Sequence, residues 1–168
     1  MTFLKLAALG LRGPHHPALS NMATANEVRI SRPHLKMLSG NYLTYKMKSE
    51  QSGGSPLCRL CSSGQEESLS HVISSCEGLS VERTKIFDEF RQMCNLTKNS
   101  INFGEISNSE HNLTQFILDP ISLNLPVRVS LSDPVVADFY KLSRQYCYKI
   151  DKTRICSLKK MFQDKQSD

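Results

Sequence analysis

The sequence predicts a mainly α fold in which a small cysteine- and histidine-containing knuckle is embedded between amphipathic helices. Two observations lead to this fold class. Apolar residues recur at intervals of three and four along several stretches, which is the spacing of one face of an α-helix. Between the first two of these stretches, cysteines and a histidine follow a segment rich in glycine and serine, a composition typical of a loop. A hairpin-like turn at the knuckle is the one non-helical element that we expect.

The first predicted helix follows a segment, residues 1–30, that we expect to be disordered. Ser31 is a suitable N-cap, and Pro33 lies in the first turn of the helix that would follow it. We expect this helix to continue to about Ser49, although Gly40 in its interior costs about 1 kcal/mol relative to alanine. The helical period is carried by four apolar and aromatic side chains: Leu35, Leu38, Tyr42 and Tyr45.

The knuckle has the spacing of metal ligands. Two residues separate Cys58 from Cys61, nine separate Cys61 from His71, and four separate His71 from Cys76. Three thiolates and one imidazole fill a tetrahedron, which is the usual ligand set of a structural zinc site. Two alternatives stay open, a disulfide in a secreted protein and a redox pair. A disulfide leaves His71 unexplained, and a thioredoxin-like redox pair follows a strand and begins a helix, whereas loop residues flank this pair.

Three further helices are expected in the second half of the chain. The first runs from Val81 to about Cys94, the second from Glu110 to Leu118, where Asp119-Pro120 stops it, and the third begins at Asp133-Pro134. We predict that the last helix packs on the first through two facing stripes, Phe87, Phe90 and Met93 against Phe139, Leu142 and Tyr146. Residues 31–95 then form a helix and zinc module, and residues 96–168 form a helical tail that packs on it.

The net charge of +5 is unevenly distributed, with bases near both ends of the chain and acids in the middle. Such a pattern favours a surface that faces a polyanion, and it also fits ordinary solvated helix faces. Tyrosines lie between these lysines and arginines in the sequence. They would either stack on unpaired nucleobases or belong to the core. The candidate nucleic-acid contacts are the five bases before and within the knuckle: Arg32, Lys36, Lys46, Lys48 and Arg59.

Cysteine usage and hydropathy bear on the compartment. Three of the six cysteines stand in expected helices with no motif spacing, so reduced thiols in a nuclear or cytoplasmic, intracellular protein fit better than a secreted scaffold. No apolar run reaches the length of about eighteen residues that a membrane span requires. We therefore expect no membrane association.

The order of these motifs resembles the zinc-binding C-terminal domain of LINE-like (non-LTR) retrotransposon reverse transcriptases. The similarity covers about residues 31–95 and rests on Leu-Ser-Gly-Asn-Tyr-Leu from Leu38, Cys-Arg-Leu-Cys from Cys58, and Ser-His-Val-Ile-Ser-Ser-Cys from Ser70. The resemblance implies a Zn²⁺ ion bound by Cys58, Cys61, His71 and Cys76. It also places Glu67 at the acidic position ahead of the histidine.

The resemblance implies a nucleic-acid-binding role, with RNA or single-stranded DNA as the partner. The chain contains no palm-like pair of aspartates and no endonuclease stretch, so it looks like a module detached from its catalytic part. A saturated Cys₃His site leaves zinc no position for a water. We therefore expect no enzymatic activity and no small-molecule substrate. The alternatives are a zinc-stabilised helical protein-interaction domain and a non-functional relic of a transposable element.

Overall fold

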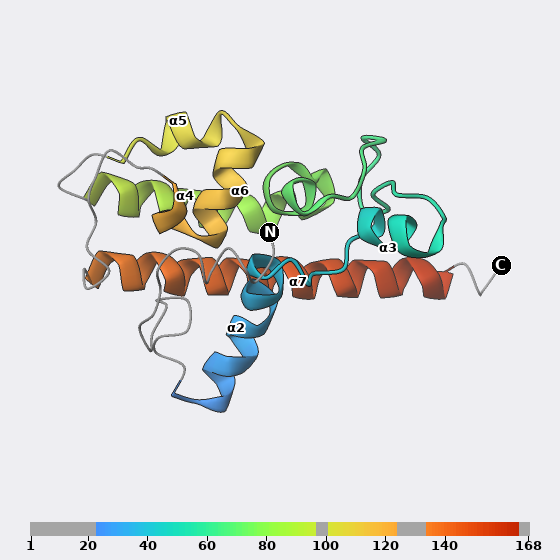
Figure 1. Ribbon diagram of the computed structural model, residues 1–168, viewed down its shortest axis with the longest axis horizontal. Helices are drawn as coiled ribbons and strands as arrows, with labels where there is room; N and C mark the ends of the chain where they lie inside the picture. The colour runs from blue at the N-terminus through green and yellow to red at the C-terminus, as the bar shows by residue number, and fades with distance from the viewer. Residues whose placement is uncertain (1–22, 97–100, 124–133, 165–168) are drawn as a thin grey trace.

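A computed structural model describes residues 23–96, 101–123 and 134–164. The longest helix, α7 (Pro134–Asp164), runs through the middle of the molecule, and α2, α4 and α6 pack against it (Figure 1). Helix α2 lies on one side of α7, whereas α4, α5, α6 and the knuckle lie on the other. The described residues form helices without a named strand, so the predicted mainly α fold is confirmed. None of the helices in this part of the chain is both long and apolar enough to cross a membrane.

Helix α2 (Ala25–Leu38) begins six residues before the predicted start at Ser31. Thr24 is its N-cap, and the Thr24 hydroxyl and the Glu27 carboxylate form a capping box, which satisfies two backbone N–H groups at the helix start. The prediction of disorder for residues 1–30 is therefore wrong from Ala25 onward, and residues 1–22 lie outside the described part. Ser31 is buried inside the helix instead of capping it.

The predicted single helix from Ser31 to about Ser49 is also wrong, because the chain leaves the helix at Leu38. Gly40 has a φ of 75°, a left-handed conformation that glycine adopts at no steric cost. The chain then runs extended to Thr44, which caps a separate short helix, α3 (Tyr45–Ser52). Gly40 thus ends one helix and turns the chain, so that α3 lies near the knuckle.

The knuckle and the elements after it are compact and short. Leu57 and Glu66 form an isolated antiparallel bridge, which agrees with the expected hairpin-like turn. A π-helix, η2 (His71–Ser75), and a 3₁₀ turn, η3 (Glu77–Leu79), then lead into α4 (Ser80–Leu96). After the gap come α5 (Phe103–Ser107), which we did not predict, α6 (Glu110–Leu118) with the bounds that we predicted, and the 3₁₀ turn η4 (Pro120–Ser122).

An aromatic cluster joins α4 to α7, as predicted. The Phe90 side chain is fully buried; its ring lies 6.4 Å from that of Phe139, nearly parallel to it, and 5.7 Å from that of Phe116. Phe87 lies 6.0 Å from Tyr146, centroid to centroid. The Tyr146 hydroxyl donates a hydrogen bond to the carbonyl of Ile73, in η2. The core therefore extends from the aromatic cluster to the elements that carry the metal ligands.

Candidate metal centre

The four predicted ligands, Cys58, Cys61, His71 and Cys76, converge. One ligand atom from each side chain can be chosen so that all four lie within 4.8 Å of one another. Cys58 Sγ lies 3.7 Å from Cys76 Sγ, and Cys61 Sγ lies 3.4 Å from His71 Nε2. In a tetrahedral site with metal–sulfur bonds of about 2.3 Å, neighbouring sulfurs are about 3.8 Å apart. The cluster thus has the donor atoms and the approximate dimensions of a tetrahedral metal site.

The hairpin-like turn positions the two cysteines of the Cys-x-x-Cys motif. The Cys58 N–H donates to the carbonyl of Gln65 over 2.9 Å, next to the Leu57–Glu66 bridge, and Gly64 turns the chain with a φ of 68°. Within the turn, the Leu60 N–H points at Cys58 Sγ over 3.4 Å. Backbone N–H groups aimed at a sulfur stabilise its thiolate form, because they place partial positive charge beside it.

The π-helix η2 orients the imidazole of His71. Its Nε2 faces Cys61, while its Nδ1 lies 3.1 Å from the hydroxyl of Ser75, at the end of the same turn. A histidine that binds a metal through one ring nitrogen commonly donates a hydrogen bond from the other, which holds the ring in place. Ser75 is therefore a positioning residue that our sequence analysis missed, and its place four residues after His71 was the available signal.

The fourth ligand, Cys76, lies where η2 ends and η3 begins. Its N–H donates to the carbonyl of His71 over 2.8 Å, and its own carbonyl accepts from Arg83 over 2.6 Å. Two residues later the chain passes very close to the first half of the knuckle. A Cβ on Gly78 would lie 2.2 Å from the carbonyl oxygen of Leu60. Only glycine lets these two loops approach so closely without a backbone shift.

Burial sets the protonation of the ligand groups. Burial raises the pKa of Cys76 to about 12 and also raises that of Cys58. Burial acts in the same direction on Cys61, but hydrogen bonds from the hydroxyl and backbone of Ser63, together with those from Cys58 and Cys76, outweigh it and lower the pKa of this thiol. Burial lowers the pKa of His71, which favours the neutral imidazole that can ligate a metal. Metal binding would release protons from the buried thiols.

The geometry bears on the two alternatives for the cysteines. All six cysteines are free thiols, so Cys58 and Cys61 are not joined to each other. Neither cysteine begins a helix, because both lie in the turn between α3 and η2, whereas a thioredoxin-like pair sits at a helix start. The arrangement therefore favours metal ligation over a disulfide or a redox pair.

Glu67 links the knuckle to two helices. Its Oε1 accepts from the Tyr45 N–H, at the start of α3, over 2.9 Å, and from Arg154 Nη2, on α7, over 2.5 Å. Arg154 also donates to the carbonyl of Leu43 over 3.3 Å. The Glu67 and Arg154 side chains are 0% and 8% exposed. A buried ion pair therefore holds α7 against the knuckle, and our sequence analysis did not identify Arg154.

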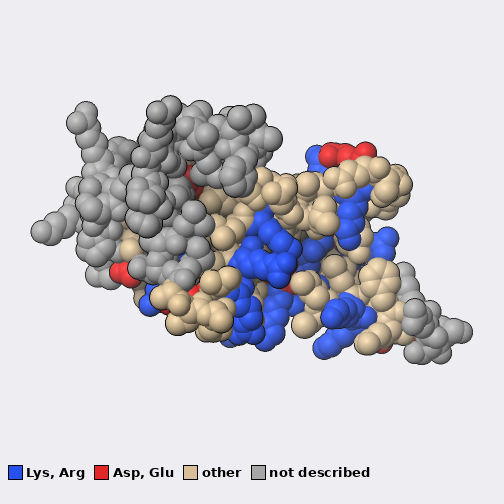
Figure 2. All heavy atoms as spheres, turned by 60° about the horizontal axis from the view of Figure 1, so that its bottom comes forward, with Lys and Arg blue, Asp and Glu red and all other residues tan. Residues whose placement is uncertain are grey.

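The five bases predicted to contact nucleic acid lie on three elements. Lys48 and Arg59 come together at one ring, with their charged groups 5.3 and 4.6 Å from the centroid of Tyr45. Lys46 forms an exposed ion pair with Glu66 over 2.8 Å. The other two, Arg32 and Lys36, are exposed on α2. Figure 2 shows lysine and arginine side chains gathered across the middle of one face and toward the C-terminal end of α7, with few acids among them.

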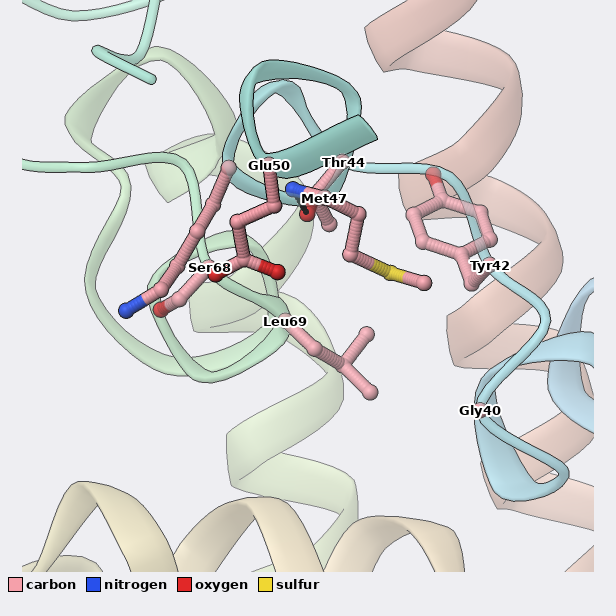
Figure 3. Close-up of a pocket in the computed structure, with 8 residues that line it drawn as sticks. Gly40, Tyr42, Thr44, Met47, Glu50, Ser68 and Leu69 are labelled. Atoms are coloured by element: carbon pink, nitrogen blue, oxygen red, sulfur yellow. Dashed lines mark hydrogen bonds between the residues drawn. The ribbon is translucent and has the colours of Figure 1, made fainter. Parts of the chain in front are cut away.

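A small open pocket lies between α3 and the segment that leads into η2 (Figure 3). Met47, Leu69 and Tyr42 supply its apolar walls, and Lys46 and Glu50 also line it. Its volume is about 170 Å³, below the range of about 300–1,000 Å³ that is typical of small-molecule sites. We assign no ligand to it.

No protein-family model, curated protein or solved structure matches this chain.

Proposed function

We propose that the chain is a zinc-stabilised, non-catalytic helical module that binds single-stranded nucleic acid. The observation that carries the zinc assignment is the convergence of Cys58, Cys61, His71 and Cys76 on one point. Three thiols and an imidazole favour Zn²⁺ over Mg²⁺ or Ca²⁺, which prefer oxygen ligands. Cys58, His71 and Cys76 are buried, and four protein ligands complete a tetrahedron. Zinc held in this way supplies folding free energy rather than an open coordination position.

Elemental analysis tests the zinc assignment. Protein purified without added metal should contain one zinc ion per chain, and Cys61→Ser should lose most of it. Cys156→Ser is the matched control, because Cys156 is an exposed cysteine on α7, outside the cluster. Equal metal content in the two variants, or another transition metal in the purified protein, would contradict the proposal. Cys61 is the ligand chosen for replacement because it is only partly buried, so the serine variant removes one thiolate ligand without creating a cavity in the core.

The nucleic-acid proposal rests on the distribution of basic side chains over the face seen in Figure 2. Lys46 already pairs with Glu66, so four of the five predicted bases remain as phosphate contacts. Four contacts on a single strand give a slope of roughly −2.8 when log affinity is plotted against log salt concentration, at about 0.7 per contact. The resemblance to the zinc-binding region of retrotransposon reverse transcriptases supports RNA or single-stranded DNA as the class of partner.

Fluorescence anisotropy with a labelled single-stranded oligonucleotide measures this slope. Affinity should fall steeply with salt, and Lys36→Ala should weaken binding to all sequences alike and make the slope shallower by about one contact's worth. Binding that is absent at low salt, or that does not respond to salt, would refute the nucleic-acid role. The module would then be better described as a protein-interaction domain with a structural zinc site.

A further inference from the structure

We infer that Tyr45, Arg59 and Phe162 form a stacking surface for the unpaired bases of a bound single strand. We call these three residues the Tyr45–Arg59–Phe162 stack. The inference deepens the proposed function and rests on it, because it names side chains that contact nucleobases, with Arg59 contacting a phosphate as well. The positive charge of the five predicted lysines and arginines does not distinguish a polynucleotide from any other polyanion. Aromatic rings open to solvent do, because they can stack on nucleobases.

The stack combines three segments that are far apart in the sequence. The Arg59 guanidinium, in the knuckle, lies 4.6 Å from the centroid of the Tyr45 ring on α3 and 5.7 Å from that of Phe162 near the end of α7. Figure 1 shows that the last turns of α7 pass beside α3. A guanidinium that lies over two aromatic rings is held in place by cation–π attraction to both. The planar groups are thus arranged before any partner binds.

The stack is open to solvent. Phe162 is 49% exposed, Arg59 is exposed and Tyr45 is partly so. A large apolar ring in this position is not needed to fill the core, because the aromatic cluster around Phe90 lies at the other end of α7. Leu43, two residues before Tyr45 in the chain, is 50% exposed as well. The stack thus presents an exposed apolar ring, Phe162, beside an exposed cation, Arg59.

Positive charge surrounds the rings on two sides. Lys48 lies over the Tyr45 ring at 5.3 Å, and Lys159 and Lys160 are exposed within one turn of Phe162. The acids nearest to the stack in sequence are Glu50 on α3, Asp164 at the end of α7, and Glu66 in the knuckle, which pairs with Lys46. Arg154 lies 6.0 Å from the centroid of the Tyr45 ring, but it is buried and paired with Glu67, so it adds no exposed charge to this surface. The local charge is therefore complementary to a phosphate backbone.

Exposed rings among cations favour a single strand over a duplex or a membrane. Bases in a duplex already stack on one another, whereas an unpaired base offers a free face to an aromatic or guanidinium plane. An anionic lipid surface would attract the same lysines, but its affinity would not depend on the presence of nucleobases. Removing the base while keeping the phosphates therefore separates the two partners.

The test uses the full zinc-loaded chain and two probes of equal length, a labelled single-stranded oligonucleotide and its abasic counterpart. Phe162→Ala should weaken binding to the base-bearing strand about fivefold to 150-fold, the range expected for one stacked base. Binding to the abasic strand and the salt slope should not change. Ile155→Ala is the matched control, since it removes a 40% exposed apolar side chain from the same helix, and it should leave both affinities unchanged.

A second variant, at Arg59, keeps the positive charge and removes the planar guanidinium group. Arg59→Lys should weaken binding to the base-bearing strand while the salt slope stays the same, because lysine still contacts phosphate but does not stack. Thermal unfolding of each variant separates a loss of contact from a loss of structure. Equal weakening on both strands, or no weakening on either, overturns the inference and leaves the nucleic-acid role standing. Tighter binding to phosphatidylserine vesicles than to either strand overturns both.

Discussion

Replacing Arg154 on α7 with methionine should destabilise the protein strongly, because it breaks a buried ion pair with Glu67. Arg154 and Glu67 are 8% and 0% exposed, and 2.5 Å separates their charged atoms. Methionine has a similar length but no charge, so it leaves the Glu67 carboxylate buried without a counterion. Removing one partner of a buried ion pair costs about 3–5 kcal/mol. For a chain of this length, that loss lowers the midpoint of thermal unfolding by roughly 6–20 °C.

Urea unfolding of the zinc-loaded protein, followed by circular dichroism, measures the loss of stability. Lys152→Met is the matched control, because Lys152 is an exposed cation on the same helix, and it should change the free energy of unfolding by less than about 0.5 kcal/mol. The double variant Glu67→Gln, Arg154→Met removes both charges. A glutamine oxygen can still accept from the Tyr45 N–H, as Glu67 does over 2.9 Å.

The double variant therefore decides whether the ion pair explains the effect. We expect it to be more stable than Arg154→Met alone, because no unpaired charge stays buried. Strictly additive losses would show that the two side chains act independently. A loss of less than about 1 kcal/mol for Arg154→Met would refute the claim that this pair holds α7 against the knuckle.

Three further predictions concern the core, the metal site and the thiols. Phe90→Ala should cost about 3–5 kcal/mol of unfolding free energy, since the ring is fully buried; a loss within error by urea unfolding would contradict the aromatic core. Ser75→Ala should weaken zinc binding by about 10- to 100-fold, because the His71 ring loses its hydrogen-bond partner. Competition with a chromophoric chelator measures the zinc affinity, and an unchanged affinity would show that Ser75 does not orient His71. In the zinc-loaded protein Cys156 should react fastest with a thiol reagent, because Cys94 and Cys147 are buried and burial raises the pKa of both. Mass spectrometry of the labelled peptides identifies the cysteine that reacts. Faster labelling of Cys94 or Cys147 would contradict the described packing.

The parts of the structure that sequence reasoning predicted are local in the chain. The four ligands lie between Cys58 and Cys76, so their spacing alone is enough to indicate a shared metal. Helix α6 was predicted with its bounds because Asp119-Pro120 ends it. The start of α2 was readable as well, since Thr24 and Glu27 form a capping box. Pro33 favours a later start at Ser31, because proline is common in the first turn of a helix.

The parts that could not be predicted depend on long-range contacts. Nothing in the local sequence distinguishes Arg154 from the other bases of α7, and its partner Glu67 is 87 residues away. Gly40 is compatible with a helix at a cost of about 1 kcal/mol, and the local sequence does not show that Tyr42, after the turn, is buried against Arg154 of α7. The Tyr45–Arg59–Phe162 stack likewise unites three segments whose proximity only the folded chain determines.

The separation between Glu67 and Arg154 has a consequence for synthesis on the ribosome. All four metal ligands precede Arg154, and 87 positions separate the two ends of the ion pair. At about 5–20 residues per second, translation takes roughly 4–17 s to cover that interval. In the zinc-bound module that we propose, all four ligands are therefore available to the ion while the Glu67 carboxylate is still hydrated. Docking of the last turns of α7 removes this water only after the ligands have been synthesised.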